Sequence, residues 1–137
     1  MADTARRQRP GENMRFIDAI GYRLPLAGLV SILHRASGLV MFILLPFIIW
    51  MFDTSLTSEI TYSQFTAVFH GGAGWFFKLL ALALIWAYLH HLIAGLRHLW
   101  MDATHAVSLQ FGRSSALFTL IVSVVLTLAL GAKLFFS

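Results

Sequence analysis

The chain has 137 residues, of which 58% are hydrophobic and 12% charged, with a mean hydropathy of +0.77 and a formal net charge of +4. A soluble domain of this size has too little interior to hide so much apolar surface, so a soluble globular fold is excluded. The chain has no cysteine, which excludes covalent haem attachment, iron–sulfur ligation and disulfides. Any redox centre must therefore use other ligands, and histidine is the first candidate.

Residues 1–28 are predicted to form a cytoplasmic N-terminal segment that lies along the membrane interface. Arginines alternate there with apolar residues, and the apolar run of a cleavable signal peptide is missing. Pro25 is expected to turn the chain into the membrane. Residues 53–74, a predicted outer loop with a flexible glycine turn ahead of Trp75, contain no lysine or arginine. The positive-inside rule therefore places the N-terminus in the cytoplasm, so membrane topology explains the positive charge better than nucleic-acid binding does.

The remaining residues, 29–137, are predicted to form a transmembrane domain of three helices, so the fold class is all-α integral membrane. The spans are expected at about residues 29–52, 75–99 and 114–136, each with an apolar run near the roughly 20 residues that a membrane-crossing helix needs. Pro46 lies inside the first span, where a local kink is expected.

The third span carries a ridge of small side chains at four-residue intervals, formed by Thr119, Ser123, Thr127 and Gly131. Small residues of this kind let another helix approach closely within a membrane. We therefore expect a partner helix to cover the ridge and the chain to work in a complex.

His90 and His91 lie well inside the apolar run of the second span, at a depth where ionisable side chains are rare unless they are paired or functional. The neighbours of His91 at helical spacing are small, namely Ala87, Ala94 and Gly95. That face has room for a flat porphyrin, so the spacing is compatible with a b-type haem. Plain helix packing, with a hydrogen bond from His91 to another helix, stays open.

Other histidines have different expected places. His98 follows His91 by seven residues on the same face, and Arg97 lies beside it near the cytoplasmic end, where hydrogen-bond donors can meet haem propionates. His90 points about 100° away from His91 and is interpreted as a polar contact. His70 and His105 are predicted to be solvated in loops.

The cytoplasmic mouth of the first span contains Ser31, His34 and Arg35, with Gly38 one turn further on. Ser31 and Arg35 are one helical turn apart, so both can donate to a carbonyl oxygen of a bound quinone, and His34 can reach a propionate. The alternative is that Arg35 extends to phosphate headgroups, an ordinary role for arginine at a helix end.

Two segments carry a resemblance that covers nearly the whole chain, SILHRASG at residues 31–38 and HLIAGLRHLWMD at residues 91–102. Together they resemble the cytochrome b556 subunits of succinate dehydrogenase, the larger membrane anchors of respiratory complex II. Each segment is specific to that family, and their joint presence at this separation makes coincidence improbable.

The resemblance implies a role for each matching residue. His91 would supply one axial ligand to the iron of haem b, which the chain would share with a histidine of a second, smaller anchor subunit, and Gly95 would pack against the haem. Ser31 and Arg35 match residues of the ubiquinone site. The residues implied near the haem propionates are His34, His98 and Arg35. The roles of His90 and Asp102 stay open.

The implied function is that of a haem- and quinone-binding anchor in succinate:ubiquinone oxidoreductase. FAD and the iron–sulfur clusters would belong to the flavoprotein and iron–sulfur subunits, and the isolated chain would catalyse nothing. With the second anchor these subunits form a heterotetramer, for which trimer formation stays open, in a bacterial inner membrane. The direction of the reaction and the quinone type also stay open.

Three alternatives are retained. The first is a haem-free structural anchor of the same kind of complex. The second is a small transporter subunit that uses its histidines as a proton relay. The third is a chain that supplies both haem ligands itself, from His34 and His91.

Overall fold

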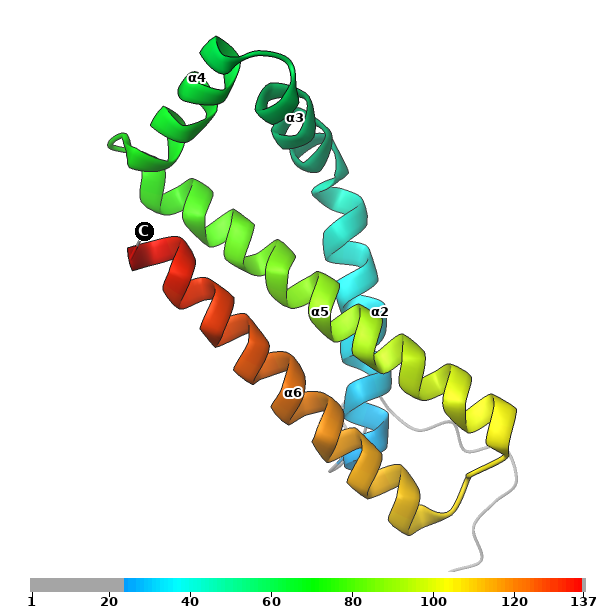
Figure 1. Cartoon of the computed structure of the whole chain (residues 1–137). Coiled ribbons are helices and arrows are strands. Elements are labelled where there is room, and N and C mark those ends of the chain that lie inside the picture. The colour runs from blue at the N-terminus through cyan, green and yellow to red at the C-terminus, as the bar shows by residue number, and fades with distance from the viewer. Residues whose placement is uncertain (1–23, 137) are drawn as a thin grey trace, which may run out of the picture.

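The computed structural model describes residues 24–136, which form five helices: α2 (Leu26–Ile43), α3 (Leu45–Leu56), α4 (Glu59–His70), α5 (Gly74–Thr104) and α6 (Leu109–Phe136) (Figure 1). Three of them, α2, α5 and α6, are long and apolar enough to cross a membrane. The prediction of an all-α membrane protein with three spans is therefore confirmed. The predicted interfacial segment lies almost wholly outside the described residues.

The first crossing is broken into two helices, whereas a single kinked span over residues 29–52 was expected. Helix α2 ends at Ile43, and Leu44 leaves the helical conformation with φ −87° and ψ 6°. Pro46 then occupies the first turn of α3. Proline has no backbone N–H to continue the hydrogen bonds of α2, and its fixed φ suits the start of a new helix.

The connection predicted as a loop contains a short helix, α4. Its N-cap is Ser58, whose hydroxyl accepts from the backbone N–H of Thr61, and the side chain of Thr61 bonds back to Ser58. Ring contacts then join α4 to its neighbours, with Phe65 beside Trp50 of α3 and Phe69 beside Phe77 of α5. This apolar cover, which the loop prediction missed, holds α3 and α4 against the start of α5.

Helices α5 and α6 lie side by side and antiparallel, and α2 crosses them (Figure 1). The small-residue ridge of α6 is buried, and a Cβ added at Gly131 would lie 2.8 Å from Leu82 of α5. The ridge hydroxyls are also satisfied locally, because Thr119 and Thr127 donate to carbonyls of their own helix. The expectation that a partner helix covers this ridge is therefore wrong, because α5 of the same chain covers it.

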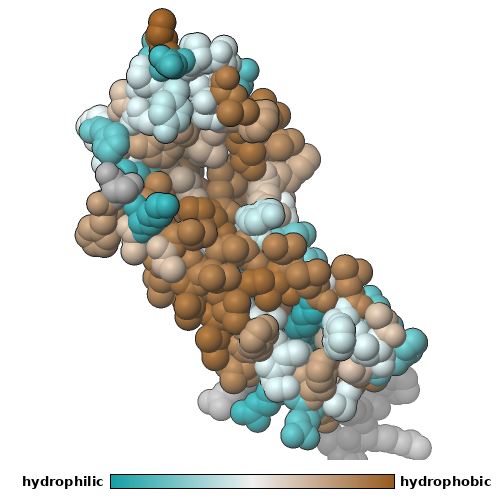
Figure 2. All heavy atoms as spheres, viewed as in Figure 1, coloured by the Kyte–Doolittle hydropathy of each residue, from teal (hydrophilic) through white to brown (hydrophobic). Residues whose placement is uncertain are grey.

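The face drawn in Figure 2 has an apolar middle between two more polar ends. In Figure 2, apolar residues cover the middle of the visible face and hydrophilic residues gather toward both ends. Large apolar side chains stay exposed in the chain on its own, for example Phe42 at 74% and Leu128 at 66%. Hydrocarbon accepts such side chains readily, so the surface fits a multi-pass membrane protein.

The packing of the three spans predicts where a larger side chain is tolerated. Ala116 of α6 is fully buried against Val30 and Ala94, whereas Ala129 of the same helix is exposed. Ala116→Leu should destabilise the assembled complex by about 1–3 kcal/mol through overpacking. Ala129→Leu should leave the thermal midpoint of the detergent-solubilised complex unchanged. Equal midpoints for the two variants would contradict this packing.

Candidate functional site

Three histidines from two helices meet where α2 crosses the C-terminal half of α5. The imidazole of His34 on α2 stacks on that of His91 on α5, with ring centroids 4.1 Å apart and planes inclined by 17°. The ring of His98, two turns further along α5, lies 5.3 Å from the ring of His34. The fold thus gathers His34, His91 and His98, which the sequence predicted to share one region.

The orientation of His91 is set by the backbone of α2. Its Nδ1 lies 3.0 Å from the carbonyl oxygen of His34 and 3.2 Å from the hydroxyl of Ser37. The Ser37 hydroxyl itself donates to the same carbonyl at 2.8 Å. A carbonyl can only accept, so Nδ1 carries a hydrogen, and in the neutral imidazole Nε2 is then the nitrogen with the lone pair. Ser37 is fully buried and was missed by the sequence prediction.

Glycines give the two rings their space. A Cβ added at Gly38 would lie only 3.0 Å from Cε1 of His91, and one at Gly95 would lie 3.4 Å from Nε2 of His34. Gly38 therefore faces His91, whereas the sequence grouped it with Ser31 and Arg35. Gly95 makes room for an imidazole of this chain.

The other small residues around His91 serve a different surface. Ala87 and Ala94 are fully buried, and Ala94 packs in the core against Val30 and Ala116. The expectation that a porphyrin lies over these two alanines is wrong, because both side chains are enclosed by the chain itself.

The stacked pair cannot act as two axial ligands of one haem. Axial ligands bind iron from opposite faces of the porphyrin, so the ring plane of the haem has to pass between them. Nearly parallel imidazoles with centroids 4.1 Å apart leave no space for it. The alternative in which His34 and His91 are both ligands is therefore contradicted by this arrangement.

His90 has a separate place from His91. It is fully buried, its Nδ1 lies 3.2 Å from the Ser123 hydroxyl of α6, and its ring stacks on Trp86. Its Nε2 has no hydrogen-bond partner among the described residues. The prediction that His90 makes a polar contact is confirmed, and this contact joins α5 to α6.

Arg97 turns away from the histidines. It is 8% exposed, and it donates from Nε to the Ser115 hydroxyl at 2.9 Å and from Nη2 to the Gly112 carbonyl at 3.2 Å. Successive residues of a helix point about 100° apart, so Arg97 faces α6 while His98 faces α2. The expectation that Arg97 accompanies His98 is therefore wrong.

Ser31 and Arg35 occupy the free side of α2. Arg35 is exposed and Ser31 is half-buried, one turn apart on the same helix. No side-chain hydrogen bond joins either residue to the rest of residues 24–136. His70 and His105 are exposed as predicted, although His70 ends α4 and His105 caps α5 in a left-handed conformation.

Bare metal ions have no ready site in the described part of the chain. Within residues 24–136, no three His, Cys, Asp or Glu side chains are arranged to hold one. One histidine whose Nε2 can bind, such as His91, is instead suited to a haem iron, which takes a single ligand on each side.

The fold and the cluster define a multi-pass helical membrane protein with a cluster of contacting histidines, His34, His91 and His98, at one end of its bundle. The family model described as "Succinate dehydrogenase/Fumarate reductase transmembrane subunit" matches residues 13–130. The chain belongs to this family, which confirms the resemblance derived from its motifs.

Relatives named succinate dehydrogenase cytochrome b556 subunit are similar over most of their length. The protein of Coxiella burnetii is 33% identical over 108 residues, 78% of this chain and 84% of its own. That of Paracoccus denitrificans is 31% identical over 126 residues, 92% of both chains. That of Rickettsia felis is 27% identical over 109 residues, 80% of this chain and 82% of its own.

The contact between Gly38 and His91 predicts opposite results for two glycine substitutions in α2. A Cβ at Gly28 would make only ordinary contacts at 3.6 Å, so Gly28→Ala should stabilise the helix by about 0.5–1 kcal/mol. Gly38→Ala should lose this gain because the new methyl group displaces His91. The thermal midpoint of the solubilised complex measures the difference. If Gly38→Ala stabilises as much as Gly28→Ala, the ring does not occupy this space.

Proposed function

We propose that this chain is the haem b- and quinone-binding membrane anchor of a succinate:ubiquinone oxidoreductase. The observation that carries the proposal is the hydrogen bond of His91 to the His34 carbonyl, 3.0 Å long. Histidines that ligate metals almost always donate their other ring N–H to a carbonyl or carboxylate, which fixes the tautomer and makes the ligating nitrogen more basic. His91 has this arrangement, and it is half-buried rather than enclosed.

Haem b would be held between this chain and its partner. His91 would give one axial ligand through Nε2, and the second would come from a histidine of the smaller anchor subunit, because His34 is stacked against His91. His34 and His98, with Arg35 nearby on α2, would offer donors to the propionates, and Gly95 would contribute by making room for the His34 imidazole at the edge of the haem. The bound haem supplies one-electron redox chemistry.

The quinone would bind beside the same cluster. Ser31 and Arg35 present a hydroxyl and a guanidinium from consecutive turns of α2, and both can donate to one quinone carbonyl. A charged donor to an oxygen that gains negative charge on reduction is stabilising, especially near the low dielectric of the membrane. The two side chains would therefore orient the quinone and favour its reduced form.

The soluble subunits would dock at the end of the bundle that carries these residues. In the sequence, an arginine-rich stretch precedes the first span, and Arg113 lies between the second and third spans. By the positive-inside rule, this distribution supports a cytoplasmic orientation of this end in a bacterial inner membrane. The flavoprotein and the iron–sulfur subunit would carry FAD and the clusters, so electrons from succinate would arrive on this side. The isolated chain would perform no dehydrogenation.

The haem assignment predicts different results for two adjacent histidines. His91→Ala in the assembled complex should abolish the b-type band in reduced-minus-oxidised spectra, because the ligand is lost. His90→Ala should keep the band but lower the thermal midpoint, because it removes only the buried contact with Ser123. A band that persists in His91→Ala would refute the ligand assignment. A wild-type complex without the band would support the haem-free anchor.

The quinone assignment predicts a loss that is confined to one half of the reaction. Arg35→Ala and Ser31→Ala should each lower quinone reduction by roughly tenfold or more, the effect of losing one hydrogen bond in a low-dielectric site. Succinate oxidation with an artificial dye should stay unchanged, as should both activities in the exposed control Arg113→Ala. If quinone reduction survives in Arg35→Ala, this arginine only contacts lipid headgroups.

A further inference from the structure

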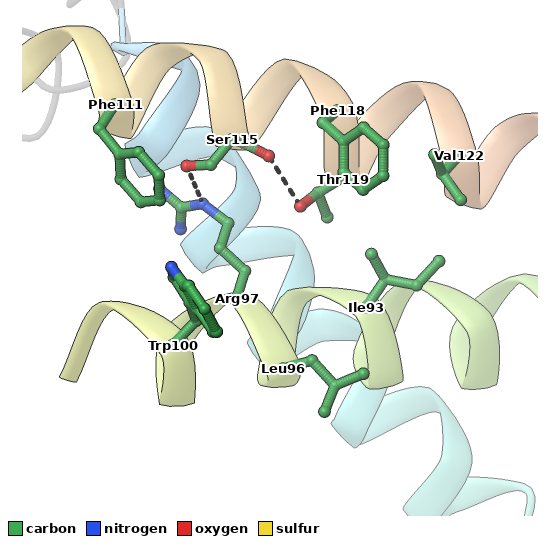
Figure 3. A pocket seen from close by; sticks show the side chains of 9 residues that line it. All are labelled: Ile93, Leu96, Arg97, Trp100, Phe111, Ser115, Phe118, Thr119 and Val122. Carbon is green, nitrogen blue, oxygen red and sulfur yellow. Dashed lines mark hydrogen bonds between the residues drawn. The ribbon is translucent and has the colours of Figure 1, made fainter. Parts of the chain in front are cut away.

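A groove of about 470 Å³ runs between α5 and α6, outside the histidine cluster. Its membrane-embedded part is lined by Ile93, Phe118 and Val122, and its cytoplasmic end by Arg97, Trp100 and Ser115 (Figure 3). The volume lies within the roughly 300–1,000 Å³ typical of small-molecule sites. One end is therefore apolar and the other carries a cation.

The guanidinium of Arg97 has more donors than the described residues 24–136 satisfy. It carries five N–H groups, of which the Nε group and one on Nη2 are engaged with Ser115 and Gly112. Both of these acceptors are uncharged, so they do not neutralise the buried cation. A charge at this depth is costly unless an anion compensates it.

Trp100 adds a second donor at the same end. Its ring is 62% exposed, and in Figure 3 its indole nitrogen points toward the guanidinium of Arg97. Tryptophan is enriched at membrane interfaces because its ring is apolar and its N–H is polar. A phosphate group placed here would meet a planar, multiply donating guanidinium, which suits its oxygens.

We propose that the groove between α5 and α6 binds a phospholipid, with its phosphate on Arg97 and Trp100 and an acyl chain against Ile93, Phe118 and Val122. A free phosphate does not explain the apolar length of the groove, and a diacylglycerol does not explain the cation. The bound lipid would support the contact between α5 and α6. This inference is independent of the haem and quinone assignments.

A photoreactive phosphatidylglycerol with a diazirine in its acyl chain tests the proposal in the purified, delipidated complex. Cross-links mapped by mass spectrometry should fall on the groove residues of α5 and α6, and unlabelled phosphatidylglycerol should compete with them. Inorganic phosphate should not compete. A diazirine-labelled diacylglycerol should label the groove roughly tenfold less, because it lacks the charge-assisted hydrogen bonds. Equal labelling by diacylglycerol would overturn the proposed phosphate contact.

Two matched valine substitutions separate the groove from general lipid contact. Val122→Phe fills the apolar part of the groove, whereas Val125→Phe changes an exposed residue of α6 that does not line it. Labelling should fall by roughly tenfold in the first variant and stay unchanged in the second. Arg97→Lys keeps the charge but loses the planar fork, so it should also weaken labelling.

Labelling spread evenly over the exposed residues of α6, or unaffected by Val122→Phe, would overturn the proposal. The proposal would also be overturned if the groove took no label and Val122→Phe released another subunit from the complex. A protein helix, and not a lipid, would then occupy the groove.

Discussion

The Nδ1–H of His91 on α5 donates to the backbone carbonyl of His34 on α2, and this contact joins the architecture to the proposed chemistry. It requires the two helices to cross closely, which the missing side chain of Gly38 allows. It also requires the carbonyl to face α5, where Ser37 donates to the same oxygen. The contact gives the imidazole a fixed orientation with Nδ1 toward the carbonyl, so Nε2 is the nitrogen left to bind a ligand.

Adjacent residues of α5 serve two different surfaces. His91 and His98 face the crossing with α2, whereas His90 and Arg97 are buried against α6. The rotation of about 100° per residue produces this division. The second surface is structural, because it holds α5 and α6 together through hydrogen bonds in an apolar setting. The first surface is half-buried, and in the proposed function a partner subunit would add the second haem ligand there.

The sequence predicted the features that depend on run length and residue type, and missed those that depend on packing. Three apolar runs were sufficient for three spans. The sequence predicted only a kink at Pro46, whereas the helix ends before it, because a hydropathy pattern contains no information about the missing backbone N–H of proline. Helix α4 was missed because its amphipathic pattern is weak, although Ser58 and Thr61 form a capping box. The grouping of His34, His91 and His98 was predicted, but the directions of Arg97 and the α6 ridge depend on which helix packs on which.

In the proposed site, His91 would ligate haem through Nε2 while its Nδ1–H stays on the His34 carbonyl. A cryo-electron microscopy map of the assembled complex, at a resolution that shows imidazole orientation, is the decisive measurement. We predict iron density on Nε2 of His91 and on a histidine of the smaller anchor, with the His34 carbonyl still beside Nδ1. Iron on His34 or His90, or on Nδ1 of His91 with the carbonyl contact broken, would contradict it.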